Sequence, residues 1–314
     1  MAILPYALKS GALAAVFCVC AVDLASAQPR SAIEACNRGD PLPQIEGCSI
    51  VIEQSSDEAV VSMAYSNRGN AHRLLGQYER SLRDLDRALD INPDDPFAYN
   101  NRGLTFADIG QFERAIEDYD RALGLDPNYA FAFSNRGNAF ASLGEFEQAL
   151  NDFSEAVRLD PGYAVALNNR GTVLEAQGRY NLAIEDYSRA LDLSPAYTSA
   201  YVNRGNTYSR LGDYERAIDD YDRALAIQDD LLEAYYGRGN TLVYIGNYWR
   251  AIEDFDRALQ INPEFAQAYA DRGHAYYELG DYETSIADLN SAISRDPNGF
   301  IAFHDRGNAH CQLG

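Results

Sequence analysis

The sequence has 314 residues, of which 46% are hydrophobic, and a formal net charge of −21 at pH 7. That hydrophobic content is typical of a folded protein. The large acidic excess argues against nucleic acids and anionic lipid surfaces as partners, since both select basic surfaces. It favours neutral or basic protein partners instead.

The N-terminal segment predicts a signal peptide over residues 1–27. Lys9 precedes an apolar run over residues 11–22, and Ala25-Ser26-Ala27 provides the small residues of a cleavage site. The run is shorter than the roughly 20 apolar residues that a membrane span needs. We therefore expect cleavage after Ala27 and a periplasmic or secreted protein that is not attached to the membrane. A retained anchor is the alternative.

Residues 28–61 read as two short capping helices joined by a turn-rich connector. Cys36 and Cys48 flank that connector, "NRGDPLPQIEG". In an oxidising compartment we expect these cysteines to form a disulfide. Two reduced, half-buried thiols are the alternative, and Cys311 has no evident partner.

From residue 62 onward the sequence repeats itself every 34 residues. An Arg-Gly pair recurs at residues 68, 102, 136, 170, 204, 238, 272 and 306. Within residues 96–129 apolar side chains follow helical spacing in two runs. Gly110 separates the runs and Pro127 ends the second, which predicts a helix–turn–helix unit.

This unit resembles the tetratricopeptide repeat. If Pro96 is repeat position 1, the family's pattern of an aromatic, glycine and alanine followed by an aromatic, alanine and proline is matched by Tyr99, Gly103, Ala115, Tyr119, Ala122 and Pro127. We expect seven repeats over residues 62–299 and the first helix of an eighth over residues 300–314. The resemblance implies an all-α fold, a right-handed α-solenoid of antiparallel helix pairs.

The glycine at repeat position 8 needs a packing explanation. Glycine inside a helix costs about 1 kcal/mol relative to alanine. We expect Gly103 to face Ala115 of the second helix, so that two small side chains let the helices approach closely.

The arginine at position 7 replaces the apolar residue usual in the family, and position 23 is uniformly aspartate. A half-buried arginine needs a partner, and a carboxylate offers bidentate geometry. We predict structural ion pairs between these positions, either within a repeat or between neighbours: Arg102, Asp118, Arg136, Asp152, Arg170, Asp186, Arg204 and Asp220. Arginines that line the groove and bind anions are the alternative.

The resemblance also implies a concave peptide-binding groove formed by the first helices. Asparagine amides can donate to and accept from a peptide backbone. We predict groove residues at position 6, Asn67, Asn101, Asn135, Asn169 and Asn203, and at position 9, Asn70, Asn138, Asn206 and Asn240. The alternative is that these asparagines only solvate or stabilise the helix surface.

No sequence motif predicts catalysis, a cofactor or a metal site. The sequence lacks a phosphate-binding loop, a zinc helix motif, a nucleophile elbow and a C-x-x-C pair after residue 27. We expect a non-catalytic, exported scaffold that binds protein or extended peptide partners. The alternative is the recognition arm of a larger enzyme such as a glycosyltransferase.

Overall fold

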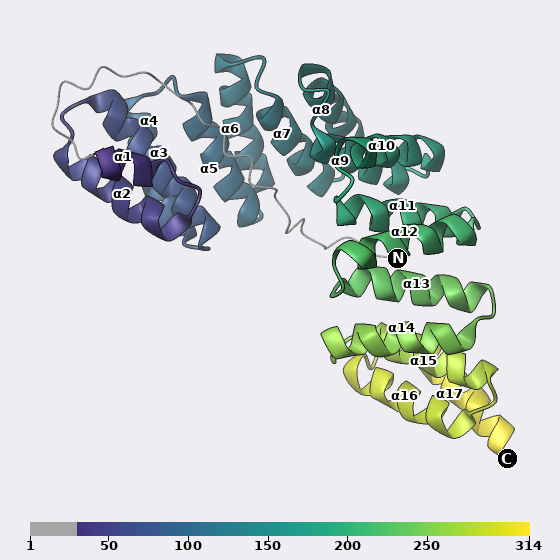
Figure 1. The fold of residues 1–314 in the computed structure, drawn as a ribbon. Coiled ribbons are helices and arrows are strands. Elements are labelled where there is room, and N and C mark those ends of the chain that lie inside the picture. The colour runs from purple at the N-terminus through teal and green to yellow at the C-terminus, as the bar shows by residue number, and fades with distance from the viewer. Residues whose placement is uncertain (1–29) are drawn as a thin grey trace. The chain divides into compact units, whose positions relative to one another are not determined.

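The computed structural model describes residues 30–314, so the predicted signal peptide lies outside the described residues. The chain divides into two compact units, which end and begin at Leu159 and Asp160. Every regular element in the described part is an α-helix (Figure 1). The prediction of an all-α solenoid of helix pairs is therefore confirmed.

The described part of unit 1 contains eight helices in chain order. They are α1 (Arg30–Cys36), α2 (Pro41–Gln54), α3 (Glu58–Leu74), α4 (Tyr78–Ile91), α5 (Pro96–Asp108), α6 (Phe112–Leu125), α7 (Ala130–Ser142) and α8 (Phe146–Leu159).

Unit 2 continues the same alternation with nine helices. They are α9 (Ala164–Ala176), α10 (Tyr180–Leu193), α11 (Thr198–Arg210), α12 (Tyr214–Ile227), α13 (Leu232–Tyr244), α14 (Tyr248–Ile261), α15 (Ala266–Glu278), α16 (Tyr282–Arg295) and α17 (Phe300–Leu313).

Local sequence sets the helix ends. The Asp95 side chain accepts a hydrogen bond from the backbone N–H of Phe97, and Pro96 occupies the first turn of α5, where a missing N–H costs nothing. Gly110 lies between α5 and α6 with a φ of 77°, a left-handed conformation that glycine adopts without strain. The sequence therefore specifies both ends of the turn.

Each helix pair packs through small and aromatic side chains. Ala115, Tyr119 and Ala122 of α6 are fully buried. Within unit 1, α3 contacts α5 and α5 contacts α7, and within unit 2, α11 contacts α13 and α13 contacts α15. The second helices of successive repeats make no such contacts in the described part. The first helices therefore line the inner side of each unit, and we call their position 6 and position 9 side chains the inner face.

The glycine at position 8 does not face the partner predicted for it. A Cβ built on Gly103 would lie 2.6 Å from Cε1 of Tyr119, and the same aromatic position opposes Gly137, as Phe153, and Gly171, as Tyr187. The expectation that Gly103 opposes Ala115 was wrong. Glycine is needed because the ring at position 24 lies flat against the first helix.

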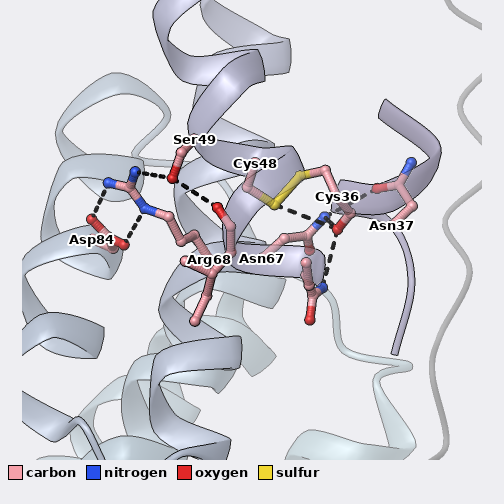
Figure 2. The surroundings of a disulfide bond; sticks show 9 residues. Cys36, Asn37, Cys48, Ser49, Asn67, Arg68 and Asp84 are labelled. Carbon is pink, nitrogen blue, oxygen red and sulfur yellow. Dashed lines mark hydrogen bonds and ion pairs between the residues drawn. A yellow bond between two sulfur atoms is a disulfide. The ribbon is translucent and has the colours of Figure 1, made fainter. Parts of the chain in front are cut away.

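Cys36 and Cys48 form the predicted disulfide between α1 and α2 (Figure 2). The Gln44 side chain donates to the carbonyl of Cys36 over 3.1 Å, which fixes the connector against α2. Cys311 is an exposed free cysteine. Among residues 30–314, no helix is both long enough and apolar enough to cross a membrane.

Candidate functional site

The arginine at position 7 joins two repeats. Arg102 of α5 donates from Nε and Nη2 to both carboxylate oxygens of Asp118 in α6, at 2.8 Å each. Its Nη1 donates to Asp86 in α4 of the preceding repeat, at 2.7 Å. The structure therefore places one pair within the repeat and a second contact between neighbours.

The other predicted pairs lie in the same geometry. Each arginine binds both oxygens of the aspartate 16 residues later, in Arg136–Asp152, Arg170–Asp186 and Arg204–Asp220. The same bidentate contact joins Arg68 to Asp84, and Arg68 also donates to Ser49 (Figure 2).

Sequence reasoning missed the third partner, at position 25. This residue is Asp86 for Arg102 and Asp120 for Arg136, but it is Ser188 for Arg204, at 2.9 Å. A usable signal was present, because position 25 precedes the next arginine by the same 16 residues that separate that arginine from its own aspartate.

Burial gives these pairs their structural character. The position 23 aspartates are buried, and burial raises the pKa of Asp152 above its usual range although the Arg136 guanidinium opposes the shift. Hydrogen bonds to Asp118 raise the pKa of Arg102, so it stays charged. The guanidinium of Arg102 also lies 5.5 Å from the ring centroid of Tyr99. These groups hold helices together, which leaves the anion-binding alternative without support.

The position 6 asparagines bridge successive first helices. Asn135 Nδ2 donates to Oδ1 of Asn100 over 2.9 Å, and Asn203 Nδ2 donates to Oδ1 of Asn168 over 3.0 Å. Asn101 makes the equivalent bond to Ser66 at 3.3 Å. An amide carries two donors and an acceptor, so each such bond fixes the side chain and leaves further polar capacity.

Two of the position 6 asparagines have different surroundings. Asn169 is buried, at 4% exposure, and accepts from the Asn168 amide. Asn67 donates to Asn37 and to the carbonyl of Cys36, next to the disulfide (Figure 2). Asn101, Asn135 and Asn203 are therefore the position 6 residues best placed to meet a ligand.

Position 9 asparagines lie on the same inner face. Asn70 accepts from Arg73 Nε, and Asn206 accepts from the Tyr221 hydroxyl over 2.7 Å. Asn138 and Asn240 are half-buried at the equivalent positions. These side chains surround the position 6 row with further polar groups.

The inner face becomes acidic towards α17. Asp271 stands at position 6 of α15, where it accepts from the Tyr236 hydroxyl over 2.7 Å and from Gln267 over 3.1 Å. Burial, the main cause, raises its pKa, and the nearby Asp305 carboxylate raises it further. This end therefore offers carboxylates where the first repeats offer amides.

The described residues contain no cluster of three or more histidine, cysteine, aspartate or glutamate side chains that could hold a metal ion.

Comparison with known proteins identifies the repeat. Sequence models described as "Tetratricopeptide repeat" match residues 162–230, 196–264, 96–129 and 255–287, and one described as "TPR repeat" matches residues 69–110, 137–178 and 273–314. No curated protein sequence matches the chain.

Several solved structures share the fold. The "APC/C hetero-tetramer Cut9-Hcn1" matches with a TM-score of 0.68 and 16% identity, over 86% of this chain and 52% of that one. This chain thus spans about half of that relative's length. PilF of Pseudomonas aeruginosa matches with a TM-score of 0.62 and 20% identity, over 68% of this chain and 97% of that one.

A third similar structure is "YrrB: a TPR protein with an unusual peptide-binding site". It has 27% identity and a TM-score of 0.48, over 59% of this chain and 95% of that one. Together the sequence matches extend over most of residues 69–314. The chain belongs to the tetratricopeptide repeat family.

Proposed function

We propose that this chain is a non-catalytic scaffold that binds an extended protein segment on its inner face. Tetratricopeptide repeats are interaction modules, and stacked helix pairs present a continuous surface of first helices. The observation that carries the proposal is the fixed amide row at position 6. Asn101 and Asn135 are each held by one hydrogen bond to the preceding first helix. Such preorganised amides bind a peptide backbone without a further loss of side-chain entropy.

We infer that the preferred partner is neutral or basic. The chain carries a net charge of −21, and the α15 end of the inner face presents Asp271. Surface carboxylates speed the encounter with cationic partners and lose this effect as salt is added. Backbone contacts through the amides and charge contacts through the carboxylates would then act on one extended ligand.

We infer further that the protein works in an oxidising compartment after removal of residues 1–27. The disulfide between Cys36 and Cys48 supports this inference, because such bonds persist mainly outside the reducing cytosol. Intact mass of the mature chain with thiol blocking would test it. A retained Met1 together with alkylated Cys36 and Cys48 would contradict it.

Selection of 12-residue peptides from a displayed random library, with the whole chain as bait, tests the inner face. Alanine at Asn101 and Asn135 should weaken the selected peptides by about 0.5–1.5 kcal/mol for each lost hydrogen bond. Asn128 lies exposed in the turn before α7 and provides the control variant, Asn128→Ala. Unchanged affinity in a folded double variant would place the ligand elsewhere.

A further inference from the structure

Unit 2 carries an exposed aromatic and aliphatic surface along the edge where each first helix turns into its second helix. We call this the turn-edge surface, and its residues are Leu182, Leu211, Tyr214, Tyr244, Ile245 and Trp249. It extends over the turns of three successive repeats, between α9 and α14. Trp249 is 67% exposed and Tyr244 is 70% exposed. Large apolar side chains gathered on one surface are typical of an interaction site.

Trp249 stands where the repeat otherwise has small polar or acidic residues. It is the only tryptophan of the chain, and it occupies position 18 in the first turn of α14. A glutamate there interacts favourably with the positive end of the helix dipole. The equivalent residues are Glu79, Glu113, Glu147, Asn181, Glu215 and Glu283. An exposed tryptophan gives up that interaction and buries little surface in return, so the fold does not explain it.

Leu182 and Tyr244 depart from the repeat in the same direction. Position 19 is arginine in four repeats, at Arg80, Arg114, Arg216 and Arg250, but it is Leu182 in α10. Tyr244 at position 13 stacks on Tyr214 of the preceding repeat, with ring centroids 5.8 Å apart and planes inclined by 8°. This stack holds an aromatic platform in place before any partner arrives.

A depression of about 320 Å³ lies beside this platform. Tyr180, Leu182 and Leu211 form its apolar walls, and Arg179 stands at its edge. The volume is at the lower end of the range for ligand sites. It therefore suits one inserted side chain better than a whole small molecule.

The charges at this edge differ from those of the chain as a whole. Arg216 pairs with Asp213. Arg179 donates only to Gln177, at 3.4 Å, and in the described part neither Arg179 nor Arg250 forms an ion pair with a carboxylate. Two arginines without carboxylate partners therefore flank an apolar surface on a chain whose net charge is −21.

We propose that the turn-edge surface is a second docking site, separate from the inner face, for an acidic segment of a partner protein. A leucine or aromatic side chain of that segment enters the depression beside Leu182, and the segment packs on Tyr244 and Trp249. Its carboxylates pair with Arg179 and Arg250. Tryptophan, tyrosine and arginine are the residues that most often dominate binding energy at interfaces.

Because Trp249 is the only tryptophan, its fluorescence reports on this surface directly. The probes are two short synthetic peptides that share a central Leu-Phe pair, flanked by glutamates in one and by lysines in the other. The glutamate peptide should shift the emission to shorter wavelength and bind more tightly than the lysine peptide. Equal or tighter binding of the lysine peptide would overturn the proposed occupant.

Variants then locate the site. Leu182→Arg and Tyr244→Ser each introduce a residue that another repeat has at that position, so the fold should be retained, and each should weaken the glutamate peptide at least tenfold. Leu74→Ser is the matched control, because Leu74 occupies position 13 in unit 1 and is 46% exposed. It should leave affinity unchanged.

Two outcomes would overturn the proposal. One is that both unit 2 variants bind as well as the unaltered chain. The other is that sedimentation shows a dimer that Tyr244→Ser dissolves, because a second copy would then be the occupant.

Discussion

Arg102 and Asp118 form a bidentate pair, from Nε to Oδ2 and from Nη2 to Oδ1, across the two helices of one repeat. Asp118 is buried, and the Arg102 side chain is about one fifth exposed. The remaining nitrogen of Arg102 reaches Asp86, so one side chain closes a repeat and ties it to its neighbour.

Arg102→Leu should destabilise the protein by about 3 kcal/mol, because it leaves the Asp118 carboxylate buried without its partner. The double variant with Asp118→Leu should recover part of that loss. Urea unfolding of both single variants and of the double variant measures the coupling. Strictly additive losses would show that the two residues do not interact.

Gly103→Ala should destabilise the protein by about 1–3 kcal/mol in spite of the better helix propensity of alanine. The new Cβ would lie 2.6 Å from the Tyr119 ring, which must move in a packed core. Gly124→Ala is the matched control within the same repeat, since nothing lies within 4 Å of a Cβ built there. It should stabilise α6 by up to about 1 kcal/mol. Thermal unfolding of both variants checks the contrast, and equal effects would contradict it.

Asp271→Asn should raise stability at pH 7. The pKa of Asp271 is raised in the folded protein, so this group favours folding below its unfolded pKa of about 4 and loses that contribution as the pH rises through the folded value. Asparagine keeps an acceptor for the Tyr236 hydroxyl and carries no charge. Its neighbours Gln267, His274 and Asp305 are unchanged. The difference in melting temperature should shrink as the pH falls and vanish below about pH 4. A constant difference would contradict the assignment.

Replacing Cys36 and Cys48 by serine should destabilise the N-terminal helices selectively. The bridge closes a loop with a sequence separation of 12. Loop-closure entropy predicts a loss of about 3 kcal/mol. Repeats contact mainly their neighbours, so the loss should stay local. Hydrogen exchange should quicken in α1 and α2 and stay unchanged in α15 and α16. Uniform acceleration across both units would argue against a local role.

Local signals in the sequence determined the helices and their repetition. A 34-residue period, apolar side chains at helical spacing, and glycine and proline at the breaks act within a few residues of one another. They sufficed for the fold class and for helix ends such as those of α5 and α6. The disulfide could also be predicted, because Cys36 and Cys48 are close in sequence and flank one turn.

Only the tertiary structure decided which side chains meet across helices. Gly103 lies against Tyr119 and not Ala115, because the register of two packed helices depends on their crossing and not on residue size alone. The second contact of Arg102, with Asp86, depends on how one repeat stacks on the next. The same stacking buries Asn169 among its neighbours while Asn101 and Asn135 keep part of their surface on the inner face. Helical periodicity places a side chain on a face, but the packing of neighbouring repeats decides whether a ligand can reach it.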